Sequence, residues 1–216
     1  MATMTATLTT RANLSITHLI AAAQFSRAVG ELERQHSGKP LADFWDDIQS
    51  NAIACVLTAI AGLESFANET FKDSKRIFPG IDQAVLARMW EVFESKTTLE
   101  KLEFALLLRG NGAFDSGKSP YQDITALTKL RNGLIHFKPE SSDELVEHTK
   151  LSKILSGRAV HTPFINPAEM LFPRAWASHG TTKWAVESTI AFMDNFAAIA
   201  GLESRVAMFA AKLRAD

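Results

Sequence analysis

The strongest pattern along the chain is a stripe of apolar residues that recurs every three or four positions from residue 44 to residue 71. Such spacing puts the apolar side chains on one face of an α-helix, and the stripe is far too long for a strand. It consists of Phe44, Ile48, Ala52, Val56, Ile60, Leu63, Ala67 and Phe71. Pro40 lies just before it, and Asp43, Asp46 and Asp47 near its start suit the positive end of a helix dipole. We therefore predict a long core helix here.

Shorter segments with helical periodicity lie on both sides of this stripe. Residues 13–35 form a first amphipathic pattern, and residues 81–96 and 98–110 form two more, which we interpret as a helical hairpin. Thr97 stands between the last two, where a threonine caps a helix start well. These segments predict three helices around the long one.

The second half of the chain begins with the breaker-rich run 109–120, RGNGAFDSGKSP, whose Pro120 can open a further helix. From Thr181 onward the long-helix pattern returns. Its continuous apolar face is formed by Trp184, Ile190, Met193, Phe196, Ile199, Val206 and Phe209. No alternating strand pattern is present, so we predict an all-α protein, an antiparallel bundle of about four to six helices. We expect one domain over 1–216, with a frayed N-terminus over 1–12 and an insertion or flap over 141–180.

Composition narrows the class of protein. Apolar residues make up 46% and charged residues 22% of the 216 positions, and no uninterrupted apolar run approaches the roughly 18 residues of a membrane span. The formal net charge of -1 offers no general attraction to nucleic acid, so any such binding needs a local basic site. The single cysteine, Cys55, lies in an apolar run and predicts a buried inert thiol. We expect a cytoplasmic protein that is not membrane-bound.

The most informative short motif is Arg131-Asn132-Gly133-Leu134-Ile135-His136. At about 100° per residue, Leu127, Leu130, Leu134 and Phe137 fall on one side of the helix and are expected to face the bundle, while Asn132 and His136 fall roughly opposite. Arg131 lies at the border, and Pro139 is expected to end the helix close to His136. A permanent cation beside a titratable imidazole suits acid/base chemistry on a phosphodiester. From the sequence pattern alone, we would interpret Arg131 and His136 as ordinary surface residues.

Support for a functional role comes from a resemblance. RNGLIH at 131–136 resembles the Arg-x4-6-His signature of the HEPN domain family, in which a polar residue, commonly Asn, follows the Arg, and residues 45–140 look like the corresponding part of bacterial HEPN proteins. The resemblance implies a helical domain that dimerises so that two motifs line one cleft, and metal-independent RNA cleavage. His136 would act as general base or acid, Arg131 would stabilise charge on the phosphate, and Asn132 would hold the imidazole or the phosphate. Polar residues are common in the family where Glu64 and Asn68 stand, so either is expected to orient Arg131 or His136.

A rival motif lies at residues 112–119, where Gly112, Gly117, Lys118 and Ser119 formally satisfy the phosphate-loop pattern G-x4-G-K-[ST]. A true phosphate loop needs a parallel sheet behind it, whereas the preceding apolar run has helical periodicity. We therefore interpret the match as coincidental. The histidines outside the motif lack ligand spacing and are expected at surface or loop positions, and neither a metal nor another cofactor is expected.

Two functional classes remain. The first is a HEPN-like endoribonuclease of the toxin or defence type, which leaves a 2′,3′-cyclic phosphate, with an antitoxin protein as a further partner. The second is a non-catalytic HEPN-like module that binds nucleotide, RNA or a protein. The intact Arg131, Asn132 and His136 favour the first, and the near-neutral net charge favours the second.

Overall fold

The computed structural model describes residues 12–141 and 145–216, so the expected frayed N-terminus lies outside the described residues except for Ala12. The all-α prediction is confirmed, because every regular element in these two ranges is a helix. In chain order they are α1 (Ser15–Gln35), α2 (Phe44–Lys72), α3 (Ser74–Ile77), α4 (Gln83–Phe93), α5 (Thr98–Arg109), α6 (Tyr121–Ile135), α7 (Val146–Leu155), the π-helical turn η1 (Leu171–Ala175), α8 (His179–Ile199) and the 3-10 turn η2 (Ala207–Phe209).

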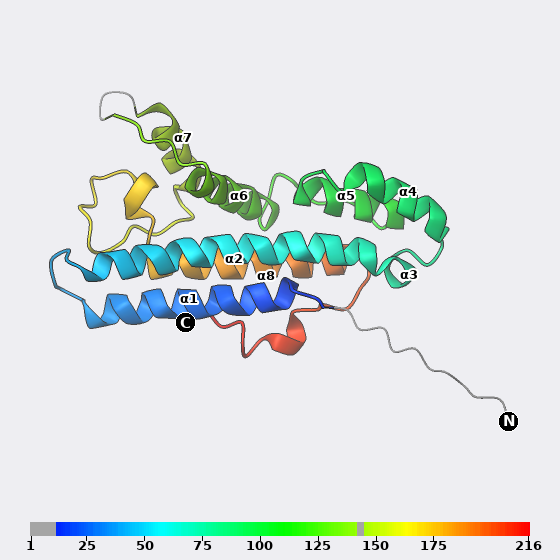
Figure 1. Ribbon diagram of the computed structural model, residues 1–216, viewed down its shortest axis with the longest axis horizontal. Coiled ribbons are helices and arrows are strands. Elements are labelled where there is room, and N and C mark those ends of the chain that lie inside the picture. Colours follow the sequence, from blue (N-terminus) through cyan, green and yellow to red (C-terminus); the bar gives the residue numbers. More distant parts are fainter. Residues whose placement is uncertain (1–11, 142–144) are drawn as a thin grey trace.

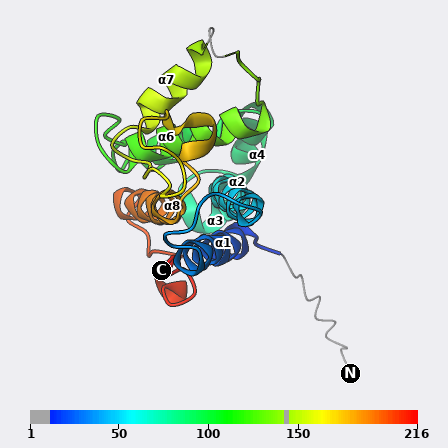
Figure 2. The ribbon, with the colours of Figure 1, turned by 90° about the vertical axis from the view of Figure 1, so that its left-hand side faces the viewer.

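The helices form two layers. The long helices α1, α2 and α8 lie side by side, and α4, α5, α6 and α7 cover one side of them (Figure 1). An end-on view shows α1, α2 and α8 as three neighbouring rods with α6, α7 and η1 above (Figure 2). The described residues hold seven helices of ten residues or more, above the expected four to six, partly because the 141–180 segment contributes α7.

The predicted core helix is α2, which contacts α1, α8, α5 and α6. Its stripe is buried as expected, with Ile48, Ala52 and Val56 fully inaccessible to solvent. A Cβ added at Gly62 would lie 3.1 Å from both the Leu19 side chain and the Ser15 backbone oxygen of α1. The absence of a side chain at Gly62 therefore lets α1 and α2 pack closely, which increases dispersion contacts between them.

By length and hydropathy alone, α2 is the one helix of the described residues that could span a membrane. Half of the relevant 18-residue window is already buried inside the protein, as expected for the central helix of a bundle. The helix also carries Asp46 and Asp47 in its first turn and Glu69 near its end.

The two shorter helices before the breaker cluster begin and end at residues that the sequence marks. Asp82 caps α4 by accepting hydrogen bonds from the backbone of Ala84 and Val85. Thr97 and Glu100 form a reciprocal capping box at the start of α5. Gly110 ends α5 in the left-handed conformation, at φ 69°, which glycine adopts without steric cost. The threonine cap predicted between the two helices is therefore present.

The last helix is shorter than its apolar pattern predicts. It ends at Ile199, and Gly201 follows with φ 63°. The Leu202 backbone N–H donates to the Ala197 carbonyl at 2.8 Å and the Gly201 N–H to the Ala198 carbonyl at 3.2 Å, the two bonds of a Schellman motif. The continuous face predicted as far as Phe209 is therefore wrong, because this glycine stops the helix and the chain turns back.

The 145–178 segment packs against α6 and the upper layer. Leu151 and Leu155 of α7, with Phe172 of η1 and Trp176, are buried and belong to the main hydrophobic cluster. The Ser152 hydroxyl accepts a hydrogen bond from the Phe172 backbone N–H at 2.9 Å, which joins α7 to η1. This segment thus supports the helix that carries the Arg-Asn-His motif.

Candidate functional site

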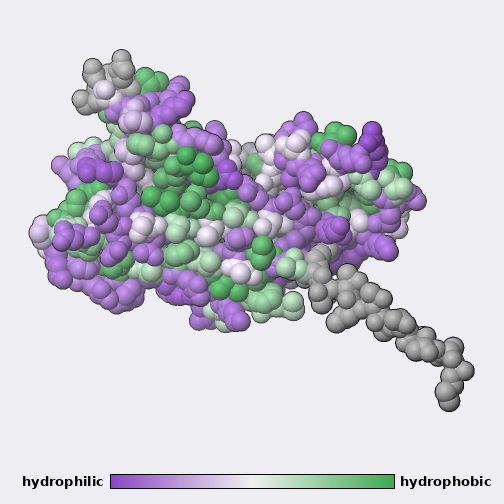
Figure 3. All heavy atoms as spheres, in the orientation of Figure 1, coloured by the Kyte–Doolittle hydropathy of each residue, from purple (hydrophilic) through white to green (hydrophobic). Residues whose placement is uncertain are grey.

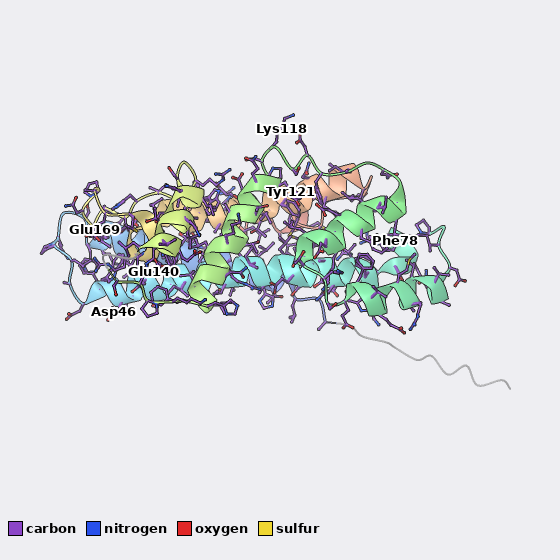
Figure 4. The ribbon with its side chains drawn as sticks, turned by 90° about the horizontal axis from the view of Figure 1, so that it is seen from above. Asp46, Phe78, Lys118, Tyr121, Glu140 and Glu169 are labelled. Carbon is purple, nitrogen blue, oxygen red and sulfur yellow. The ribbon has the colours of Figure 1, made fainter. Side chains whose placement is uncertain are left out.

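The motif occupies the last turn of α6, which crosses α2 obliquely with Tyr121 at its start and Glu140 just beyond its end (Figure 4). Leu127 and Leu130 are fully buried and hold the helix on the bundle. The helix ends at Ile135, and the His136 backbone N–H closes it by donating to the Asn132 carbonyl at 2.9 Å. The helix end predicted near His136 is confirmed.

Arg131 is held by partners on two helices. Its guanidinium forms an ion pair with Glu64 of α2, 67 residues away in sequence, and donates to the Asn132 side-chain oxygen at 2.9 Å. The Arg131 side chain is 23% exposed and that of Glu64 is 42% exposed. Of the two polar residues expected to orient the motif, Glu64 therefore contacts Arg131. One edge of the guanidinium is fixed while part of it still faces solvent.

Asn68, the other expected partner, pairs with a different helix. Its side-chain oxygen accepts a hydrogen bond from Lys101 of α5 at 3.0 Å. The Lys101 ammonium also lies 5.2 Å from the centre of the Trp90 ring, within cation–π range. Burial lowers the pKa of Lys101, and the nearby carboxylates of Glu94 and Glu64 act in the opposite direction.

Lys101 was not predicted as a site residue. It is only 9% exposed, and its electrostatic interaction with Glu64 links it to Arg131. The available signal was its position, because Lys101 precedes Ala105 by one helical turn on the buried side of an amphipathic helix. A buried lysine is rare unless it is paired, so such a position marks a candidate functional cation.

His136 is exposed, as expected of a residue that would line a surface cleft. Within residues 12–141 and 145–216, its imidazole has no hydrogen-bond or ion-pair partner. Asn132 lies one turn earlier but uses its side-chain oxygen to accept from Arg131. The structure thus brings Asn132 to the guanidinium and leaves the imidazole open to a ligand or a second chain.

The chain immediately after His136 is held by α7. The buried His148 donates from Nε2 to the Lys138 carbonyl at 3.0 Å. The Glu140 carboxylate accepts from the backbone N–H groups of Glu147 and His148, at 2.9 and 3.0 Å, at the start of α7. These backbone hydrogen bonds, above all that from His148, lower the pKa of Glu140. The surface or loop position expected for His148 is therefore wrong, because its ring is needed inside this packing.

Phe137 corrects another expectation. It was predicted to face the bundle with Leu127, Leu130 and Leu134, but it is 48% exposed. Helical periodicity does not apply to it, because the helix has ended two residues earlier. Its ring instead stacks on His148, with centroids 5.5 Å apart, and lies 6.0 Å from Phe172.

Gly133 lets α7 approach the motif closely. A Cβ at this position would lie 2.6 Å from the Leu151 side chain and 3.5 Å from that of Phe172. The space that this glycine leaves free is therefore filled by the protein's own α7 and η1.

Exposed apolar side chains adjoin the motif. Ile135 is 51% exposed and Val146 is 56% exposed, and both fractions are close to the 48% of Phe137. A hydrophobic patch lies over the junction of α6 and α7 in the space-filling view (Figure 3). Contiguous apolar surface beside a polar site is typical of an interaction surface.

The phosphate-loop match at residues 112–119 has no supporting sheet, since the described residues contain no strand and the preceding apolar run is α5. Lys118 is exposed at the tip of the loop and pairs with Asp115 at 3.0 Å (Figure 4). The geometry fits an ordinary surface turn.

No protein-family model, curated protein or solved structure matches the chain. The candidate site therefore rests on the geometry of Arg131, Asn132, His136 and Glu64.

Proposed function

We propose that this chain is a HEPN-type, metal-independent endoribonuclease of the toxin or defence class, acting in the cytoplasm. The observation that carries the proposal is a partly exposed guanidinium, fixed by Glu64 and Asn132, at the same helix end as an exposed imidazole that has no partner among the described residues. Oriented cations and acid/base groups are what cleavage of a phosphodiester requires.

In the proposed reaction, His136 takes the proton from a ribose 2′-OH, and the 2′-oxygen attacks the adjacent phosphorus. The bond between phosphorus and the 5′-oxygen breaks, and a second imidazole, which is protonated at the start, gives its proton to that oxygen and becomes neutral. The products are a 2′,3′-cyclic phosphate and a 5′-hydroxyl. Arg131 stabilises the charge that develops on the phosphate oxygens, and Asn132 positions Arg131.

The second imidazole is that of another copy of the chain, in a homodimer. Ile135 and Phe137, the exposed apolar residues on either side of His136, support such an interface, because a dimer there would bury them and bring two motifs together. An antitoxin protein that covers the same surface would silence the site.

The test incubates purified protein with mixed RNA in EDTA and compares wild type with Arg131→Ala and His136→Ala. Arg88→Ala is the matched control, because Arg88 is an exposed arginine that, among the described residues, forms an ion pair with its helical neighbour Glu91 alone. We expect both motif variants to lose at least about 100-fold in cleavage rate, since acid/base groups and oriented charges each contribute that much. Cleavage that is absent in the wild type, or unchanged in both variants, refutes the proposal.

One observation favours the alternative, a non-catalytic HEPN-like module that binds nucleotide, RNA or a protein. The Glu64 carboxylate already neutralises the charge of Arg131. In that case the wild type binds RNA or a partner without cutting it, and the same experiment separates the two functions.

A further inference from the structure

A pocket of about 870 Å³ lies where α2 ends, between α2, α3 and α4. These three helices meet at the right of Figure 1. Its size suits a small organic ligand, since such sites typically span about 300–1,000 Å³. Leu86, Ala87 and Trp90 of α4 give it an apolar wall, and Asn68 lines the side nearest to Lys101.

The pocket is connected to the Arg-Asn-His motif through a row of polar side chains. Arg131 contacts Glu64, and Glu64 interacts electrostatically with Lys101. Lys101 donates to Asn68, which lies one helical turn beyond Glu64 on α2 and lines the pocket. One turn of α-helix rises about 5.4 Å, so the pocket begins within one nucleotide's reach of the motif.

The acidic residues of the pocket are largely neutralised. Glu69 pairs with Arg205 at 3.3 Å and accepts from the Ser15 backbone at 2.9 Å and from the Ser15 hydroxyl at 2.7 Å. Asp73 pairs with the same Arg205 and lies 3.6 Å from Arg76.

The basic residues of the pocket stay available. Lys72 and Lys75 form no ion pair with any described residue, and Glu94 is offset by Lys101. The pocket therefore presents two lysines without an ion pair among the described residues, Lys72 and Lys75, beside an apolar wall.

We propose that this pocket binds a nucleotide of the RNA strand next to the cleaved phosphate, with Lys72 and Lys75 contacting its phosphates and Trp90 with Ala87 contacting its base. The inference rests on the proposed ribonuclease function and adds a substrate subsite to it. A cationic groove combined with an aromatic side chain is the usual means of holding single-stranded nucleic acid. It also supplies a local basic site in a chain whose net charge is -1.

The test measures binding of a fluorescent single-stranded RNA, methylated at every 2′-oxygen so that it cannot be cleaved, by anisotropy over a range of salt concentrations. The variants are Lys72→Ala and Lys75→Ala, with Lys39→Ala as the control because Lys39 is exposed in the α1–α2 connection at the opposite end of α2. Each pocket variant is expected to reduce the slope of log affinity against log salt by about 0.7, the loss of one phosphate contact on a single strand. Thermal unfolding checks that both variants remain folded.

A second pair of variants tests the apolar wall. Ala87→Glu puts a carboxylate into the pocket, whereas Val85→Glu puts one on another face of the same helix, at a position 48% exposed. We expect Ala87→Glu to weaken RNA binding about fivefold and Val85→Glu to leave it unchanged. Adenosine monophosphate is expected to displace the RNA only weakly, because it cannot also contact Arg131.

The outcomes separate the two proposals. If Arg131→Ala impairs binding or cleavage while the Lys72, Lys75 and Ala87 variants match wild type, the pocket assignment is overturned and the ribonuclease stands. Tight displacement by adenosine monophosphate would assign the pocket to a free nucleotide and also overturn it. If the RNA does not bind at all, both proposals fail.

Discussion

Gly133 offers a sharp test of how α7 packs on the motif. Gly133→Ala places a Cβ 2.6 Å from the Leu151 side chain, far inside ordinary contact distance. Overpacking of this kind costs about 1–3 kcal/mol, whereas alanine gains at most about 1 kcal/mol in helix propensity over glycine. We therefore expect a net loss of about 1 kcal/mol in the free energy of unfolding, with a melting temperature lower by about 3 °C.

The effect of Gly133→Ala on the free energy of unfolding should change sign when Leu151 is shortened. Leu151→Ala alone is expected to cost about 2–3 kcal/mol, because Leu151 is only 9% exposed. In that background the new methyl group meets no clash, so Gly133→Ala should stabilise by about 1 kcal/mol. The double-mutant cycle then gives a coupling free energy of about 2 kcal/mol.

Denaturation by guanidinium chloride, followed by circular dichroism, measures all four proteins of the cycle. Gly80→Ala is the control, since a Cβ at Gly80 meets nothing within 4 Å. Stabilisation by Gly133→Ala in the presence of Leu151, or additive effects of the two substitutions, would refute the close packing of α7 on the motif.

Three further predictions concern single side chains. Glu64→Gln should tighten RNA binding a fewfold, because a carboxylate no longer competes with phosphate for Arg131, and it should lower the cleavage rate. Weaker RNA binding of this variant, measured by anisotropy, contradicts the competition between Glu64 and phosphate. Thr97→Ala should cost about 1 kcal/mol of stability in chemical denaturation. Hydrogen bonds from Thr97 lower the pKa of Glu100, so the stabilisation that they give is present above the usual glutamate pKa and is lost as pH falls through the lowered pKa. This acid dependence of stability should be smaller in Thr97→Ala. An unchanged dependence of stability on acid pH contradicts the role of Thr97 at Glu100. Burial raises the pKa of Cys55, so a thiol reagent should modify it only in denaturant, and rapid labelling of the native protein contradicts the buried placement.

The elements that the sequence predicts well are those specified locally. The start of α5 depends on Thr97 and Glu100, three residues apart, and the apolar stripe of α2 repeats over seven turns. The end of α8 was missed for a local reason too, because Gly201 interrupts an apolar pattern that otherwise continues. A left-handed glycine outweighs hydrophobic periodicity, since the Schellman hydrogen bonds close the helix there.

The site is less predictable because its contacts are long-range. Glu64 and Asn68 share a face of α2 and could not be distinguished from sequence, yet one pairs with Arg131 and the other with Lys101. That choice depends on where α5 and α6 lie on α2, which no local pattern specifies. Lys101 was overlooked for the same reason, because its partners come from α2 and α4.

The contacts around His136 explain how the backbone of a short motif can be fixed while its side chain stays accessible to solvent. Upstream, Arg131 is fixed to α2 by Glu64; downstream, the Lys138 carbonyl is fixed by the buried His148 of α7. The backbone of His136 is therefore constrained from both sides while its imidazole remains exposed. Preorganised positions of this kind lower the cost of orienting a group during reaction. The 145–178 segment thereby has a direct role at the site, because without α7 the chain beyond His136 would lose the contacts that fix its direction.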